Sequence, residues 1–162
     1  LFLHASSVNE DGCGYAFVGR SNAGKSTTAR MGAFKRILSD ELTIIRRINH
    51  TYVLFSNPWW NSAADINIVR PQEPVPLKAI FFIKKARKTR MRKMGLKEAL
   101  AKLIYSDQIF KQAIFCRGPS EIKKSYRLYL ALSISIPVFE LRIKKGDSFR
   151  QEFQFLLNQY LN

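Results

Sequence analysis

The stretch GRSNAGKS, residues 19–26, meets the pattern G-x-x-x-x-G-K-[ST] in full. The two glycines allow backbone amides to approach phosphate oxygens closely, and the lysine adds a positive charge. An apolar segment, YAFVG at 15–19, precedes the loop, and STTARMGAF at 26–34 favours a short helix. Strand, glycine loop and helix in this order predict a P-loop that binds nucleotide phosphates. The alternative is a glycine-rich turn with a surface lysine.

Every position of this loop is a candidate for contact with a nucleotide. Lys25 would neutralise the β- and γ-phosphates, and Ser26 would offer its hydroxyl to Mg²⁺. Arg20 would add positive charge near the transferred group or point into solvent. The predicted nucleotide-binding residues are Gly19, Arg20, Ser21, Asn22, Ala23, Gly24, Lys25, Ser26 and Thr27.

Two adjacent acids, Asp40 and Glu41, follow the apolar ILS of a predicted strand at 37–42. Beside a P-loop, an acid at the end of a strand typically holds Mg²⁺ directly or through water. Such an acid can also take the proton from an attacking hydroxyl. The pair predicts a functional role, for Asp40 more than for Glu41, and the alternative is a solvated turn.

Length and composition indicate one ordinary domain over residues 1–162, with 46% hydrophobic residues for a core. The two cysteines, Cys13 and Cys116, do not read as a disulfide framework, which favours a reduced, cytoplasmic setting. No apolar run is long enough to span a membrane. The sequence starts at Leu1 and not at Met, which is compatible with a fragment that lacks its natural N-terminus.

The net charge of +15 is unusual, and its densest part is KKARKTRMRK at 84–93, which contains no acid. This run reads as a solvated basic segment that favours an anionic partner. Nucleic acid, an acidic protein, a phosphorylated substrate and a membrane surface all qualify, as does a surface loop without a dedicated partner. No exposed aromatic residues are expected to interleave with the charge, which argues against nucleic acid as the partner.

The order of apolar segments predicts an α/β domain with a mixed sheet flanked by helices. Some strand pairs must be antiparallel, because the connections at 9–14 and 49–50 are too short for a crossover. The turn NPWWN, at 57–61, is expected to pack its two tryptophans. Strands are predicted at 1–8, 15–19, 37–42, 42–48, 51–56, 76–83 and 138–143, and helices at 26–34, 96–106, 106–115, 119–133 and 147–160.

Several stretches together resemble a known family: LFLHASSV (1–8), GYAFVGRSNAGKSTTAR (14–30), ILSDE (37–41) and the turn at 57–61. They are similar to the catalytic domain of HPr kinase/phosphorylase, and more closely to uncharacterised bacterial HPr-kinase-like proteins. These share a phosphoenolpyruvate-carboxykinase-like P-loop fold. The resemblance covers most of the chain and is specific through about residue 61. Arg20 stands where these kinases often carry an acid, Asn22 replaces the usual glycine, and a further metal-binding glutamate has no match.

The resemblance implies an ATP-binding, Mg²⁺-dependent phosphotransferase that acts on a hydroxyl of a protein, peptide or small molecule. Lys25, Asp40 and His4 would be catalytic, and His4 matches a histidine near the phosphates, although a plain strand histidine is equally compatible. Ser26, Asp40 and Glu41 would hold the metal. Alternatives are a nucleotide-binding module without turnover and a nucleic-acid-associated NTPase. The family also makes a homo-oligomer possible.

Overall fold

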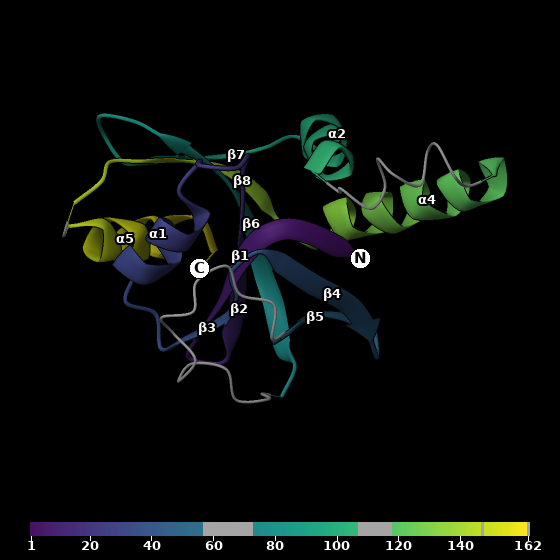
Figure 1. Cartoon of the computed structure of the whole chain (residues 1–162), viewed down its shortest axis with the longest axis horizontal. Helices are drawn as coiled ribbons and strands as arrows, with labels where there is room; N and C mark the ends of the chain where they lie inside the picture. The colour runs from purple at the N-terminus through teal and green to yellow at the C-terminus, as the bar shows by residue number, and fades with distance from the viewer. Residues whose placement is uncertain (57–72, 107–117, 147, 162) are drawn as a thin grey trace.

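A mixed sheet runs through the centre of the molecule, with helices on both of its faces (Figure 1). This computed structural model describes residues 1–56, 73–106, 118–146 and 148–161. The strands are β1 (Phe2–Glu10), β2 (Cys13–Val18), β3 (Arg36–Ser39), β4 (Leu42–Ile48), β5 (Thr51–Phe55), β6 (Val75–Lys85), β7 (Arg90–Lys93) and β8 (Val138–Ile143). The helices are α1 (Lys25–Met31), α2 (Leu96–Ser106), α4 (Pro119–Ser135) and α5 (Phe149–Leu161).

The strands follow the order β2-β1-β4-β5-β6-β8-β7, with β3 paired to β1. Strand β6 pairs in parallel with both β2 and β8, whereas the remaining pairs are antiparallel. The carboxyl ends of β2, β6 and β8 therefore lie at one edge of the sheet. In α/β sheets ligands bind beyond this edge, so the pairing indicates where to look for a site.

Alternate residues of β6 enter two separate cores, as the period of a strand requires. Ile80 and Phe82 pack under α2 and α4, together with Leu103 and Tyr129. The residues between them face α1 and α5 on the other side of the sheet. That second core is rich in aromatic rings and contains Phe17, Phe81, Phe139, Phe149 and Phe153. Together the two cores make β6 the central element of the sheet.

The predicted class is confirmed: the sheet is mixed and is flanked by helices. The two short connections do join antiparallel strands, β1 to β2 and β4 to β5. The predicted helices at 26–34, 96–106, 119–133 and 147–160 correspond to α1, α2, α4 and α5, with ends shifted by a few residues. No described helix is long and apolar enough to cross a membrane.

Several predicted strand boundaries are wrong, including that of β1, which extends to Glu10, and one strand was not predicted. The basic segment 84–93 is not a loop, because it contains the end of β6 and all of β7. Strand β7 has one apolar residue, Met91, among charged ones, so the alternation of apolar and polar residues that marks a strand is not visible in its sequence. Strand β3 ends at Ser39, so the acids lie in the turn that follows. Strand β2 begins at Cys13, since the hairpin turn is tight. The turn at 57–61 and the helix expected over 107–115 lie outside the described residues.

Candidate functional site

A cavity of about 680 Å³ lies beside the glycine loop, beyond the carboxyl ends of β6 and β8. Its volume lies within the range that holds small-molecule ligands. The loop forms one wall, β1 and the turn after β3 form another, and the ends of β6 and β8 complete it. The lining residues are His4, Ser21, Asn22, Ala23, Gly24, Lys25, Ser26, Thr27, Thr28, Met31, Glu41, Lys85, Ala86, Ile143 and Lys145.

The conformation of the glycine loop explains its residue types. A Cβ atom on Gly19 would lie 2.8 Å from Cβ of Ala23 and 3.1 Å from Cγ1 of Ile83, so a side chain cannot be accommodated there. Gly24 has φ +97°, in the left-handed region that favours glycine. Asn22 also has a positive φ, 63°, and asparagine tolerates this region better than most residues. Asn22 can therefore replace a glycine without losing the turn.

Lys25 lies against the loop with its side chain directed back at the backbone. It is 6% exposed, and its Nζ donates to the carbonyl oxygens of Gly19 (3.3 Å) and Arg20 (3.4 Å). Burial lowers the pKa of Lys25, while the negative charges of Glu41 and Asp40 act in the opposite direction. The ammonium group thus lies close to the cavity and within electrostatic reach of both acids.

The two adjacent acids occupy different environments. Asp40 is 4% exposed, and its Oδ1 accepts a hydrogen bond of 2.9 Å from Oγ of Ser6 in β1. It is not among the residues that line the cavity, whereas Glu41 is. Oε2 of Glu41 lies 3.1 Å from Nε2 of His4. Glu41 therefore presents its carboxylate to the cavity, and Asp40 lies behind it.

His4 is the member of β1 that reaches the cavity. Burial lowers the pKa of His4, and the positive charge of Lys25 lowers it further, while Glu41 acts against both. With an ordinary value near 6.5 lowered in this way, the ring is mostly neutral at neutral pH. A neutral His4 can hold the carboxylate of Glu41 by a hydrogen bond.

Most of the predicted site residues come together in this cavity. His4, Glu41 and the loop from Ser21 to Thr27 all line it. Gly19 and Arg20 form the first turn of the loop instead, where the Arg20 carbonyl accepts a hydrogen bond of 3.0 Å from the Ala23 amide. Asp40 is the other predicted site residue that does not line the cavity.

Two lysines that the sequence analysis did not select also line the cavity. Lys85 is the last residue of β6, and Lys145 follows the end of β8. Lys85 ends one strand and Lys145 comes two residues after the end of the other; these strands run parallel to each other, and β6 also runs parallel to the strand before the glycine loop. Their position at or just beyond the ends of apolar strands could have indicated these two lysines from the sequence. The sequence did not show, however, which strands pair with the strand before the glycine loop. With Lys25 they bring three positive charges to the cavity.

The cavity contains oxygen groups of the kind that Mg²⁺ prefers, the hydroxyl of Ser26 and the carboxylate of Glu41. Among the residues that the structure describes, no group of three or more His, Cys, Asp or Glu side chains could hold a metal alone.

The sequence matches the family model of the SynChlorMet cassette protein ScmC over residues 1–158. The chain belongs to the ScmC family. A search of curated proteins finds no match for it. The structure of this ScmC-family chain is similar to that of the Hpr(Ser) kinase/phosphatase from Coxiella burnetii, with a TM-score of 0.54 and 11% sequence identity. That similarity covers 99% of this chain and 90% of the other, and it shows a shared fold.

Proposed function

We propose that this ScmC-family protein binds ATP with Mg²⁺ in the cavity and transfers the γ-phosphoryl group to a hydroxyl of a protein, peptide or small molecule. One observation carries the proposal: the glycine loop, the buried Lys25 and the His4–Glu41 pair all meet in one cavity. The fold, which is like that of a kinase/phosphatase, supports it. We place the protein in a reduced, cytoplasmic setting as part of this proposal.

The phosphate groups would lie along the loop amides and the lysines. The hydrogen bonds from Lys25 Nζ to two carbonyl oxygens are long, 3.3 and 3.4 Å, so phosphate oxygens can replace these partners at little cost. Lys85 and Lys145 would add positive charge from the ends of β6 and β8. Phosphoryl transfer depends mainly on positioning and charge neutralisation, which this arrangement supplies.

Mg²⁺ would be held by Ser26, with phosphate oxygens and water completing its shell, and would neutralise part of the phosphate charge. Glu41 would take the proton of the acceptor hydroxyl. The bond from the acceptor oxygen to phosphorus then forms as the bond between the γ-phosphorus and the bridging oxygen breaks and ADP leaves. His4 would keep Glu41 oriented, since its ring lies 3.1 Å from the carboxylate.

Asp40 was the favoured base from the sequence, but its position supports a different assignment. It accepts a hydrogen bond from Ser6 and does not line the cavity, so we propose that it acts on Lys25 through its charge. A nucleotide-binding module without turnover is the second candidate function. The burial of Asp40 away from the cavity is the observation that favours it.

The first test is equilibrium binding of ATP–Mg²⁺ to the full chain. Lys25→Met is expected to lower ATP affinity at least tenfold, because it removes a charge that pairs with phosphate. The matched control is Lys78→Met, at an exposed lysine of β6 outside the cavity, which is expected to leave affinity unchanged. If Lys25→Met binds ATP as the unmodified chain does, the assignment of the loop is wrong.

The second test is transfer of γ-labelled phosphate from ATP to components of a host lysate. Glu41→Gln is expected to keep ATP binding and to lower transfer by about a hundredfold or more, since general base catalysis contributes on that scale. Asp40→Asn is expected to cost less, because its Oδ1 can still accept from Ser6. A larger loss for Asp40→Asn would return the role of base to Asp40. Binding of ATP without any transfer would favour the second candidate.

A further inference from the structure

The sheet carries a row of positive charge on one face, beyond the region that α2 and α4 cover. Lys84 of β6 lies opposite Arg142 of β8, and Arg142 lies opposite Arg90 of β7. Residues directly opposite each other in a sheet point to the same face, so these three side chains form a row about 10 Å long across three strands. Lys84 and Arg142 are each 56% exposed, which leaves the row open to solvent.

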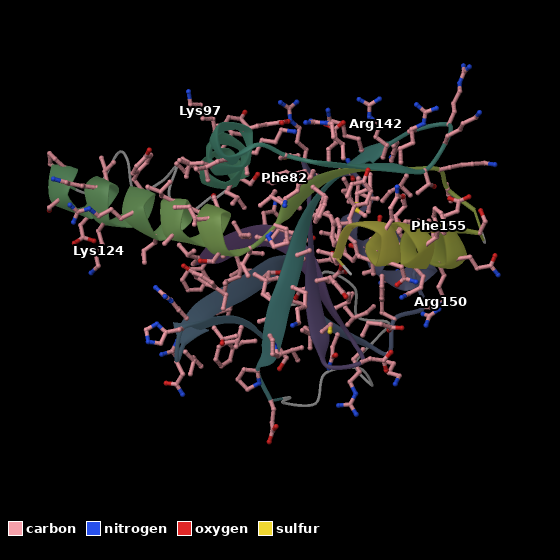
Figure 2. The ribbon with its side chains drawn as sticks, turned by 180° about the vertical axis from the view of Figure 1, so that it is seen from behind. Phe82, Lys97, Lys124, Arg142, Arg150 and Phe155 are labelled. Carbon is pink, nitrogen blue, oxygen red and sulfur yellow. The ribbon has the colours of Figure 1, made fainter. Side chains whose placement is uncertain are left out.

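The row belongs to a larger cluster, which we call the basic face. It is built on the ends of β6 and β8, on β7 and on the neighbouring helix α2. Figure 2 shows the same edge of the molecule, with Lys97 of α2 and Arg142 both pointing outward along it. The basic face is defined by Lys84, Arg90, Arg92, Lys102 and Arg142, with the carboxylates of Glu98 and Glu140 among them.

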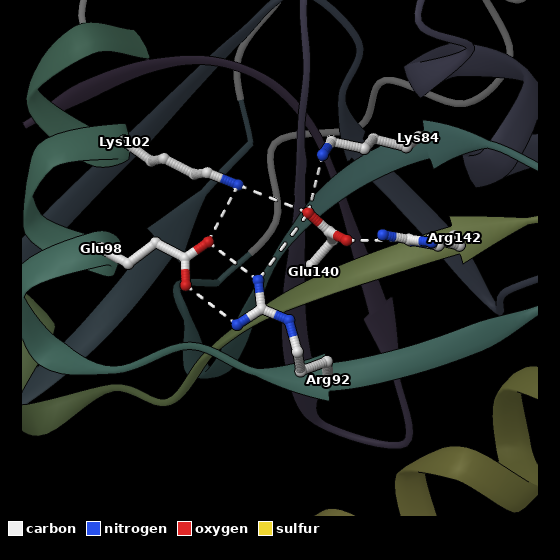
Figure 3. Close-up of polar contacts among 6 residues, drawn as sticks. All are labelled: Lys84, Arg92, Glu98, Lys102, Glu140 and Arg142. Atoms are coloured by element: carbon white, nitrogen blue, oxygen red, sulfur yellow. Dashed lines mark hydrogen bonds and ion pairs between the residues drawn. The ribbon is translucent and has the colours of Figure 1, made fainter.

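Glu140 is the centre of the cluster and is already fully engaged (Figure 3). Its side chain is 5% exposed. The pKa of Glu140 is lowered to about 2, first by the hydrogen bond from Lys84 and then by that from Arg142, against the effect of burial. Its cationic neighbours are Lys84 at 2.8 Å, Arg142 at 3.0 Å, Lys102 at 3.6 Å and Arg92 at 3.9 Å.

Glu98 of α2 is engaged as well. Both of its carboxylate oxygens accept hydrogen bonds of 2.9 Å from Arg92, and Lys102 lies 3.4 Å away. Arg90 is exposed and makes no ion pair with any residue in the described part of the chain. The basic face therefore has five cations for two carboxylates, and the surplus of positive charge is directed into solvent.

The chemistry of the face favours carboxylates as its ligands. The fork of Arg92 already holds a carboxylate through two parallel hydrogen bonds, the geometry by which arginine recognises this group. Phe82, the aromatic ring beneath Lys102, is buried, and Nζ of Lys102 lies 5.5 Å from its centroid, so this ring is not available for stacking a base. A surplus of a few charges is also small for duplex DNA, whose binding grows with the number of phosphates neutralised.

We propose that the basic face binds an acidic segment of a protein partner, whose Asp and Glu side chains pair with Arg90, Arg142 and Lys84. Lys85, which lines the cavity with the glycine loop, points to the opposite face of the sheet from Lys84, since the two are consecutive in β6. The interaction goes beyond the proposed phosphotransferase and does not depend on a nucleotide in the cavity.

The test uses the full chain and a fluorescently labelled glutamate homopeptide as the probe, with binding followed by anisotropy at about 0.15 M salt. Arg90→Gln combined with Arg142→Gln is expected to weaken peptide binding about tenfold, since two exposed charge pairs are lost. The matched control is Lys123→Gln combined with Lys124→Gln on α4, which removes the same charge far from the face. This control is expected to change affinity less than twofold.

A single Arg90→Gln variant keeps the test valid if the double variant unfolds, because Arg90 makes no described ion pair. It is expected to weaken binding about threefold. Equal losses in the α4 control would show attraction by net charge alone and overturn the proposal. A uridine oligonucleotide of equal charge and vesicles with anionic lipid are tested in the same way. The proposal is wrong if the chain binds either of them more tightly than the peptide and the Arg90→Gln variant no longer binds it.

Discussion

Replacing Glu140 with Gln is expected to destabilise the folded chain at neutral pH. The hydrogen bond from Lys84 is the main reason why the pKa of Glu140 is about 2 and not near its ordinary 4.5. A difference of this size corresponds to roughly 3 kcal/mol between the two protonation states. Because Lys84 and Arg142 are more than half exposed, solvent screens the interaction, and we expect a loss of about 1–2 kcal/mol.

The loss should depend on pH with a definite sign. The pKa of Glu140 is lower in the folded chain than in the unfolded one, so its contribution to stability is fully present above about pH 4.5. That contribution declines as the pH falls toward 2, where the folded state also takes up the proton. The difference in unfolding free energy between wild type and Glu140→Gln should therefore shrink over this window.

Urea unfolding at a series of pH values measures this difference. Glu121→Gln is the matched control, because Glu121 is exposed at the start of α4 and makes no ion pair with a described residue. We expect it to change stability by less than about 0.5 kcal/mol at every pH. Equal losses for the two variants, or a Glu140→Gln loss that persists unchanged down to pH 2, would refute the ion-pair argument.

Three further predictions concern the loop, the core and the histidine. Gly19→Ala should lower ATP affinity at least tenfold, because the added Cβ would collide with the loop. Gly95→Ala, which has open space around it, should leave affinity unchanged, and equal affinities for the two variants would contradict the loop geometry. Phe153→Ala should lower the free energy of unfolding, measured with urea, by about 3–5 kcal/mol. Phe155→Ala, at a ring that is 70% exposed, should lower it by under about 1 kcal/mol, and similar losses for the two variants would contradict the described core. NMR titration should give His4 a pKa below 6.5 that rises when the loop lysine is replaced by methionine, and an unchanged value would show that the two are not close.

Local patterns were sufficient for much of the fold. The hairpin around 49–50 could be predicted because two alternating segments are separated by two residues, which leaves an antiparallel pair as the available geometry. Strand β7 could not be predicted in the same way. Only Met91 among its residues is apolar, and that side chain packs because β8 lies beside it, which the sequence does not reveal.

The candidate site also has one part that local sequence patterns predict and another part that they do not. The loop of residues 19–26 was recognisable because its pattern G-x-x-x-x-G-K-[ST] consists of residues that are adjacent in the chain. Its partners are distant in sequence, and Lys85 and Lys145 join it because β2, β6 and β8 run parallel and end at one edge. Parallel pairing leaves no local pattern in the sequence, since crossover connections separate the strands.

The sequence by itself determined that a glycine loop with a lysine precedes a short helix and that two acids follow the next strand. Only the tertiary structure decided which acid faces the cavity. Neighbouring residues point in different directions, and here the contact of Asp40 with Ser6 directs it inward while Glu41 reaches His4. Those contacts join segments more than thirty residues apart, and a choice between two adjacent side chains depends on such long-range packing.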